Sequence, residues 1–175
     1  MYKWFRNKNV CLVGSASSLL SGSNGEFIDS FDYVVRCNRG IIIKNEIAQG
    51  IRTDVWAIGQ GKSVKDLIPL YDIPHVSLSH AQRNRNDIKH WMTTQMQFAL
   101  RKRLGHRIPS TGLNMAWYIQ HYKPLSLTLI GFDWKRTPTW YFEEGKYQPH
   151  NWKLEEAFMR SKIKCKIIDN NDLPK

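Results

Sequence analysis

The chain has 175 residues, of which 42% are hydrophobic and 23% charged, and its formal net charge is +11. These values are typical of one globular domain with a buried core over residues 1–175, and they exclude disordered and fibrous chains. The longest apolar stretches, such as 125–132, are far shorter than the ~20 residues that a membrane-spanning helix needs. The positive charge indicates an anionic partner: a phosphorylated or carboxylated substrate, a nucleic acid or a membrane surface.

The first residues and the cysteines bear on the cellular compartment. Residues 1–6 contain basic and aromatic side chains with no apolar signal region behind them, so we expect a cytoplasmic protein with at most peripheral membrane contact. Cys11, Cys37 and Cys165 show no C-x-x-C spacing. We therefore expect reduced, buried thiols, with neither a disulfide framework nor a metal site.

Apolar runs typical of strands alternate with helical patterns along the chain. Predicted strands cover 9–13, 33–37, 53–58, 75–78, 125–130 and 164–168, and predicted helices cover 62–70, 86–104, 111–122 and 151–160. This alternation predicts an α/β fold with a mostly parallel sheet between helices, whose ligands lie beyond the carboxyl ends of the strands. Residues 135–149 are aromatic and polar with prolines, and we expect them to form a lid loop.

Two turns offer groups that bind phosphate. Gly14 follows the first predicted strand and precedes Ser15, which predicts a tight turn and a helix start whose free N–H groups face an anion. Thr111 and Gly112, next to a capping Ser110, repeat the arrangement. A glycine turn after a first strand is also common in folds that bind no nucleotide, so Gly14 alone is a weak signal.

A more specific pattern lies in the order of several segments. They read L-V-G-S-A-S-S-L and F-D-Y-V-V-R-C-N-R-G within 9–54, I-P-S-T-G-L-N-M-A and L-T-L-I-G-F-D within 108–133, W-Y-F-E at 140–143 and H-N-W-K-L-E at 150–155. In this order they resemble the four sialyl motifs of the sialyltransferases, glycosyltransferase family 29. The resemblance covers roughly residues 9 to 160, and bacterial sialyltransferases of a neighbouring family share some of these elements.

The resemblance implies a fold and a reaction. The fold is a single Rossmann-like domain, a variant of the GT-A type. The reaction is an inverting transfer, without metal or other cofactor, of a sialic acid or a related nonulosonic or keto-deoxy sugar. The donor is a CMP-sugar, and the acceptor is the hydroxyl of a glycan that is free or lipid-linked.

The resemblance also assigns roles to particular residues. His150 matches the general base, which removes the proton of the acceptor hydroxyl, and Glu155 is kept as a support of the site. The expected donor-binding residues are Gly14, Ser15, Ala16, Asn38, Arg39, Ser110, Thr111, Gly112, Gly131, Phe132 and Tyr141. Lys135 is a further cation that can meet the charge of the leaving phosphate.

The sequence departs from the family pattern at four positions. Val10 and Lys123 stand where the family has two cysteines that pair as a disulfide, which agrees with a reducing compartment. Ser15 replaces an Asn that touches the nucleotide, and Trp140 replaces a His. These departures keep open a non-catalytic module on the same fold that binds a nucleotide or RNA. A different nucleotide-sugar transferase or a phosphatase-like enzyme is a further alternative.

The segment 83–107 is rich in Lys and Arg and includes aromatic residues. Its simplest interpretation is a solvated helix face. The alternatives are attraction of an anionic acceptor glycan or membrane surface, and RNA binding through basic and aromatic contacts.

Overall fold

One parallel sheet organises the molecule. A computed structural model describes residues 4–59, 64–78, 90–141 and 150–168. Within them, seven strands follow the order β5-β4-β3-β2-β1-β6-β7, and all six neighbouring pairs are parallel. The strands are β1 (Asn9–Val13), β2 (Tyr33–Cys37), β3 (Val55–Ile58), β4 (His75–Ser77), β5 (His90–Trp91), β6 (Ser126–Ile130) and β7 (Lys166–Ile168). The predicted α/β fold with a parallel sheet is confirmed.

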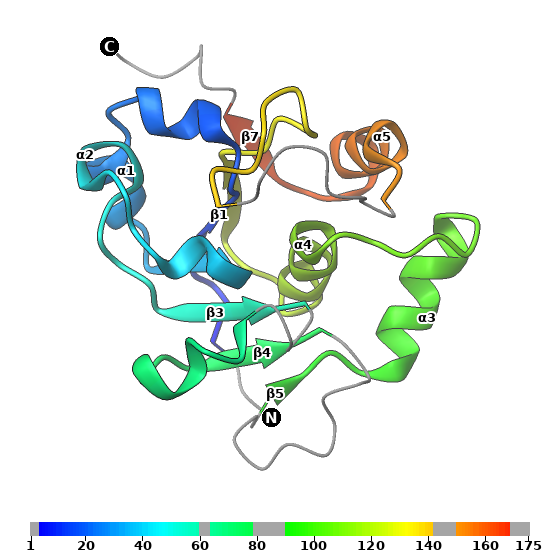
Figure 1. Cartoon of the computed structure of the whole chain (residues 1–175). Coiled ribbons are helices and arrows are strands. Elements are labelled where there is room, and N and C mark those ends of the chain that lie inside the picture. The colour runs from blue at the N-terminus through cyan, green and yellow to red at the C-terminus, as the bar shows by residue number, and fades with distance from the viewer. Residues whose placement is uncertain (1–3, 60–63, 79–89, 142–149, 169–175) are drawn as a thin grey trace.

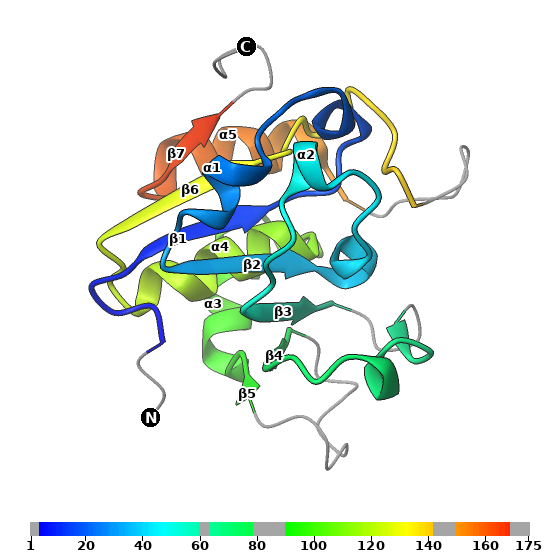
Figure 2. The same ribbon diagram turned by 90° about the vertical axis from the view of Figure 1, so that its left-hand side faces the viewer.

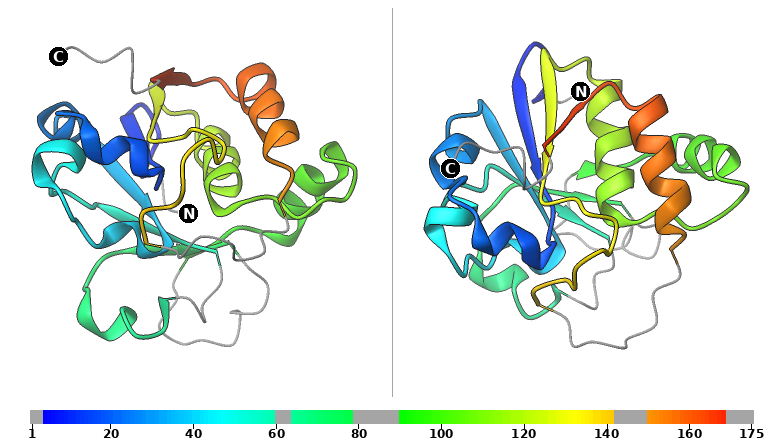
Figure 3. Two further views of the ribbon diagram at one scale, coloured as in Figure 1. Left: turned by 45° about the horizontal axis from the view of Figure 1, so that its top comes forward. Right: turned by 90° about the horizontal axis from the view of Figure 1, so that it is seen from above.

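Helices cover both faces of this sheet. The α-helices are α1 (Gly25–Asp29), α2 (Glu46–Gln49), α3 (Thr94–Arg103), α4 (Thr111–His121) and α5 (Trp152–Lys162), and short 3-10 helices are η1 (Ser17–Ser21), η2 (Asn38–Ile41) and η4 (Ile68–Leu70). Figures 1 and 3 show α3, α4 and α5 on one face, with α1 and α2 on the other. In the described residues, no helix has the length and apolar character needed to cross a lipid bilayer.

The alternation of side chains along β1 explains the two layers, because successive strand residues point to opposite faces. Val10 and Leu12 pack into the core on the α3–α5 face, whereas Cys11 and Val13 pack on the α1 face. All four are at most 2% exposed. Both faces of β1 are therefore dry, as is typical of central strands in parallel sheets.

Two predicted helices are wrong in part. Within 86–104, β5 (His90–Trp91) pairs with β4 and α3 begins only at Thr94. Thr93 accepts a hydrogen bond from the backbone N–H of Met96 and so caps the helix, which stops it from extending backwards. Residues 86–89 lie outside the described residues.

The predicted helix over 62–70 is the second correction. From Val64 onward the chain forms turns and the short 3-10 helix η4, while residues 62 and 63 lie outside the described residues. Pro69 lies in η4 and lacks the N–H that an α-helix requires. The apolar side chains of Val64 and Leu67 are nevertheless buried against Trp56.

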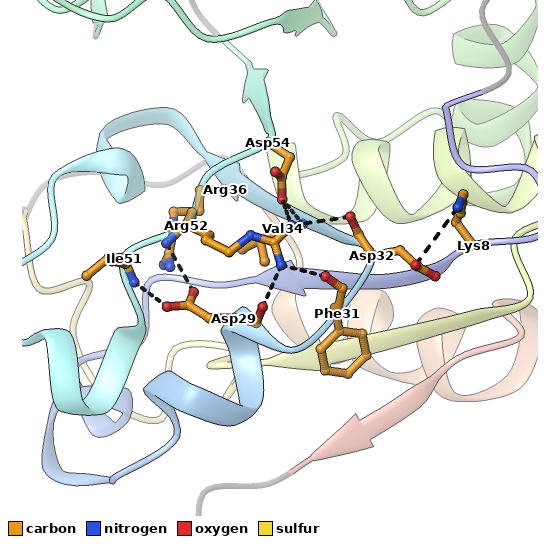
Figure 4. A network of polar contacts seen from close by, with 9 residues as sticks. All are labelled: Lys8, Asp29, Phe31, Asp32, Val34, Arg36, Ile51, Arg52 and Asp54. Carbon is orange, nitrogen blue, oxygen red and sulfur yellow. Dashed lines mark hydrogen bonds and ion pairs between the residues drawn. The ribbon is translucent and has the colours of Figure 1, made fainter.

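The α1 face contains a buried guanidinium. Arg36 of β2 is 0% exposed, and it donates to the carbonyls of Arg52 at 2.9 Å and Gln49 at 2.6 Å. Arg52 in turn donates to the backbone carbonyl of Asp29 and to the carboxylate of Asp54. Figure 4 shows the part of this network around Arg52, which ties the segment after α2 to β2 and to the end of α1.

The thiols are not paired with one another. Cys11 and Cys37 are buried, Cys165 is half-buried, and all three are free. Burial raises the pKa of Cys11 and Cys37 to about 12. The prediction of reduced thiols agrees with these positions.

Candidate active site

The candidate site lies at the carboxyl edge of the sheet, where the direction of strand addition reverses. Successive strands from β1 to β5 are added on one side of β1, and β6 is added on the other. Figure 2 shows β1, β2 and β3 pointing to the same edge. A ligand of a doubly wound sheet binds outside such a switch point.

Gly14 and Gly131 form the closest backbone approach at the switch point. The N–H of Gly14 donates to the carbonyl of Ile130 at 2.7 Å. A Cβ on Gly14 would lie 2.1 Å from the carbonyl oxygen of Gly131, so a larger residue does not fit. Gly131 has a φ of +74°, a conformation that favours glycine. Both residues are therefore required by the turn itself.

The chain after Gly14 differs from the prediction. It enters the 3-10 helix η1 rather than an α-helix. The N–H groups of Ala16, Ser17 and Ser18 already donate, to the carbonyls of Gly131 and Pro138 and to the hydroxyl of Thr137. The expectation of free N–H groups in this turn is wrong for these three residues, and Ala16 does not offer its N–H to a phosphate.

The segment 137–141 accepts hydrogen bonds from N–H groups that the prediction gave to a ligand. Ala16 and Thr139 form an isolated antiparallel bridge, and the N–H of Trp140 donates to the carbonyl of Ser15 at 3.2 Å. Asp133 holds the start of the segment, because its carboxylate accepts the N–H groups of Lys135 and Thr137 at 3.0 and 2.9 Å. The first part of the predicted lid, up to residue 141, is thus attached to the Gly14 turn. Residues 142–149 lie outside the described residues.

This attachment brings Tyr141 to the site. Its hydroxyl is in hydrogen-bond contact with the side chains of Ser15 and Asn38. Burial raises the pKa of Tyr141 to about 12, although both hydrogen bonds and the nearby Arg39 act in the opposite direction. The phenol therefore stays protonated at neutral pH and can donate a hydrogen bond to an anion.

Asn38 connects the ends of β2 and β3 with the start of α4. It has a positive φ of 48°, which an Asn tolerates better than most residues. Its Nδ2 donates to Oγ1 of Thr111 at 3.0 Å, and its Oδ1 accepts the N–H of Gly59 at 2.9 Å. Its backbone carbonyl accepts Nε1 of Trp56 at 2.7 Å. Both side-chain groups of Asn38 thus position the start of α4 against β3.

The start of α4 offers backbone N–H groups that favour an anion. Ser110 caps the helix by accepting the N–H of Leu113 at 3.2 Å. The N–H groups of Thr111 and Gly112 belong to the first turn, where no carbonyl of the helix can pair with them. A Cβ on Gly112 would lie 2.5 Å from the ring of Phe132, so the ring packs directly against this turn. These N–H groups and the helix dipole favour a phosphate or carboxylate.

Ser110 is fixed from the other side by Glu155, in the first turn of α5. The carboxylate of Glu155 accepts the N–H of Ser110 at 2.7 Å and its hydroxyl at 2.5 Å. Glu155 is 3% exposed, and this burial raises its pKa, against the two hydrogen bonds from Ser110 and the charge of His150. The carboxyl therefore acts as a buried support for the start of α4.

His150 lies beside this support. Its Nδ1 is 3.0 Å from the carbonyl oxygen of Ile108 and 4.0 Å from Oε1 of Glu155. A carbonyl oxygen only accepts hydrogen bonds, so Nδ1 is the protonated nitrogen of the neutral ring and Nε2 carries the lone pair. This tautomer leaves the lone pair on Nε2, and Glu155 lies where its charge favours a positively charged ring.

The predicted residues form one connected set. Contacts run from Ser15 through Tyr141, Asn38 and Thr111 to Gly59, and from Gly14 through Gly131 and Phe132 to Gly112. Arg39 also pairs with Asp66 at 3.0 Å, and Lys135 donates to the hydroxyl of Thr139. The roles of all these residues toward a ligand remain predictions.

Three residues of this edge were not predicted as site residues. A Cβ on Gly59 would lie 2.1 Å from Oγ1 of Thr111, Trp56 holds the Asn38 carbonyl, and Asp133 holds the segment that carries Tyr141. Gly59 directly follows a predicted strand, and Asp133 lies three residues after another. Their position after a strand could have indicated that they belong to the site. The contact of Trp56 with Asn38 could not be predicted in this way, because it depends on the pairing of β2 with β3.

This geometry defines an α/β protein whose sheet edge offers N–H groups to an anion and carries a histidine beside a helix N-terminus. Comparison with protein families adds a match between residues 6–68 and glycosyltransferase family 29 (sialyltransferase). No curated protein sequence matched the chain. The matched residues include Gly14, Asn38 and Gly59.

Solved structures of sialyltransferases share this fold. A mammalian sialyltransferase in complex with Gal-beta-1-3GalNAc-ortho-nitrophenol has a TM-score of 0.66 and 16% identity, and the match covers 92% of this chain and 69% of that chain. The sialyltransferase CstII from Campylobacter jejuni, in complex with the substrate analogue CMP-3FNeuAc, has a TM-score of 0.57 and 13% identity, with 91% and 78% covered. At these identities the likenesses establish the fold.

Together with the family match, they confirm the resemblance that the motifs predicted. The chain is therefore similar to the sialyltransferases of glycosyltransferase family 29, through a family match over residues 6–68 and a shared fold.

Proposed function

We propose that the protein transfers a sialic acid, or a related nonulosonic or keto-deoxy sugar, from a CMP-sugar to a hydroxyl of a glycan. The observation that carries the proposal is His150, whose Nδ1 is held by the Ile108 carbonyl at 3.0 Å beside the start of α4. His150 contacts the segment 108–112, which also begins α4, so a donor phosphate at the start of α4 lies near the imidazole that takes a proton.

The reaction needs a base on one side of the anomeric carbon and donors on the other. Nε2 of His150 accepts the proton of the acceptor hydroxyl as its oxygen attacks the anomeric carbon. The bond from that carbon to the phosphate oxygen breaks, and CMP leaves with the electron pair. A single displacement of this kind inverts the configuration.

The departing phosphate gains negative charge in the transition state. The N–H groups of Thr111 and Gly112, with the dipole of α4, are the donors that meet this charge. The hydroxyl of Tyr141 is protonated at neutral pH, because burial raises its pKa to about 12, and adds a further donor. We propose that these groups do this without a metal ion.

A comparison structure also supports the choice of the donor nucleotide. CstII is solved with CMP-3FNeuAc, and the present chain has the same fold and the connected set of predicted donor-binding residues. We therefore propose CMP as the nucleotide.

A nucleotide panel tests the proposal. Thermal shift with CMP, UMP, GDP and ATP is expected to raise the melting temperature with CMP alone, because a ligand that binds the folded state stabilises it by mass action. CMP-sialic acid is then expected to release CMP in the presence of EDTA. Binding of CMP without turnover of any CMP-sugar would support the non-catalytic alternative. Absence of CMP binding would contradict both.

A further inference from the structure

A basic and apolar surface lies at the C-terminal end of α3, outside the connected set of site residues. It comprises Phe98, Arg101, Lys102, His106, Arg107 and Ile108, all exposed, and is called here the α3 surface. Residues 90–108 contain no Asp or Glu. Figure 1 shows α3 projecting at the rim of the molecule.

The backbone holds these side chains together. Phe98, Arg101 and Lys102 are spaced i, i+3 and i+4 and therefore share one face of the helix. The helix then ends in a Schellman turn, in which the N–H of His106 donates to the carbonyl of Arg101 at 2.7 Å and that of Gly105 to Lys102 at 3.3 Å. This turn reverses the direction of the chain, so the ring centroids of His106 and Phe98 lie 6.4 Å apart.

The cations of this surface are not neutralised within the described part of the protein. The ion pairs found there involve none of Arg101, Lys102 and Arg107. Cations in a last helical turn also favour the helix dipole. Arg107 lies beyond the helix, however, and the dipole does not explain the two exposed apolar side chains.

Those apolar side chains decide which anion fits. Phe98 is 61% exposed and Ile108 is 50% exposed. A free phosphate or a soluble sugar acid would neutralise the cations and leave both side chains in water. The boundary between lipid headgroups and acyl chains takes up cations and apolar side chains together. An RNA base can stack on Phe98, but Ile108 offers no flat ring.

We propose that the α3 surface docks the protein on an anionic lipid membrane. The proposal does not require the sugar transfer to be correct. The surface is continuous with the candidate active site, because Ile108 contributes its side chain to the surface and its carbonyl to His150 at 3.0 Å. Docking through α3 thus brings Nε2 of His150 close to the plane of the lipid headgroups, where a lipid-linked acceptor presents its sugar.

Vesicle flotation tests this docking. The purified full chain is mixed with phosphatidylcholine vesicles, or with vesicles of phosphatidylcholine and phosphatidylglycerol, and the bound fraction is measured at several salt concentrations. We expect binding to the anionic vesicles alone. Arg101→Glu/Lys102→Glu is expected to weaken it by about tenfold or more, since each basic residue near an anionic surface contributes about 1 kcal/mol. Phe98→Ser is expected to weaken it as well.

Matched variants separate a specific surface from the net charge of the whole protein. Lys164→Glu/Lys166→Glu changes the formal charge by the same amount at the β7 edge, where both side chains are exposed, and is expected to bind like the wild type. Phe27→Ser removes an exposed Phe from α1, on the opposite face of the sheet, and is also expected to bind like the wild type. Melting temperatures check that each variant is folded.

Several results would overturn the docking. The first is that the protein binds neither kind of vesicle. The second is that Lys164→Glu/Lys166→Glu weakens vesicle binding as much as Arg101→Glu/Lys102→Glu does. The third is that Phe98→Ser binds the anionic vesicles as well as the wild type does. Displacement of the vesicles by short RNA at equal phosphate concentration would identify the α3 surface as a nucleic-acid site instead. Each result is independent of whether CMP-sialic acid is turned over.

Discussion

The carboxylate of Glu155 accepts both the backbone N–H and the side-chain hydroxyl of Ser110, at 2.7 and 2.5 Å, and so joins the first turn of α5 to the N-terminus of α4. This pair connects His150 with the anion site, because His150 precedes α5 and Ser110 precedes Thr111 and Gly112.

Removal of the Glu155 carboxylate is expected to lower the stability of the fold. Glu155→Ala leaves the buried N–H of Ser110 without its acceptor, which lowers the free energy of unfolding by about 2–3 kcal/mol. Glu155→Gln keeps an acceptor oxygen and is expected to lower it by less. Denaturant unfolding measures both changes. If Glu155→Ala unfolds at the wild-type midpoint, the pair has no structural role.

Substitution of Gly59 is expected to damage nucleotide binding. The Cβ of Gly59→Ala would lie 2.1 Å from Oγ1 of Thr111, so the start of α4 must shift away from Asn38. We expect CMP affinity to fall by about tenfold or more, as for the loss of one hydrogen bond to a charged group. Gly40→Ala is the matched control, since a Cβ there meets no atom within 4 Å. Titration calorimetry with CMP compares the two, and equal affinities would contradict this role of Gly59.

Tyr141 is expected to act through its hydroxyl. Tyr141→Phe removes one donor to the leaving phosphate, and we expect kcat to fall by about 100-fold, as for other donors to a developing anion. The phenol is the donor only below its pKa, which burial raises to about 12 from an ordinary value of 10. The ratio of wild-type to variant kcat is therefore expected to stay constant through the neutral and mildly alkaline range. A ratio that declines with rising pH near neutrality would show that Tyr141 ionises there.

The buried guanidinium of Arg36 is expected to stabilise the fold without acting in catalysis. Arg36→Leu leaves the carbonyls of Gln49 and Arg52 without their donor, and the free energy of unfolding is expected to fall by about 3 kcal/mol. Arg6→Leu, at an exposed position, is expected to change it little. Figure 4 shows Arg36 beside Arg52 and Asp29. Equal unfolding midpoints for the two variants would rule out this role.

The positions of the site turns followed from the sequence because parallel strands end at one edge. Gly14, Asn38, Gly59 and Gly131 each follow a predicted apolar run, and the structure places all four at that edge. The cap at Ser110 was equally local, since it depends on residues three apart.

What the sequence did not reveal depends on contacts between distant segments. The N–H groups of Ala16 and Ser17 are used by Gly131 and Pro138, more than a hundred residues away in the chain, and no local pattern indicates this. The two-residue strand β5 is also too short to produce a strand periodicity. It exists because β4 offers an edge to pair with.

CMP release from CMP-sialic acid, in the presence of an acceptor glycan, tests the role of His150 most directly. His121 is a matched control, because its Nδ1 also contacts a backbone carbonyl, that of Trp117 at 2.7 Å, but at the far end of α4. We predict that His150→Ala lowers kcat by about 100-fold or more, the usual contribution of a general base, while His121→Ala keeps wild-type turnover. Wild-type turnover by a folded His150→Ala variant would contradict the assignment of His150 as the base.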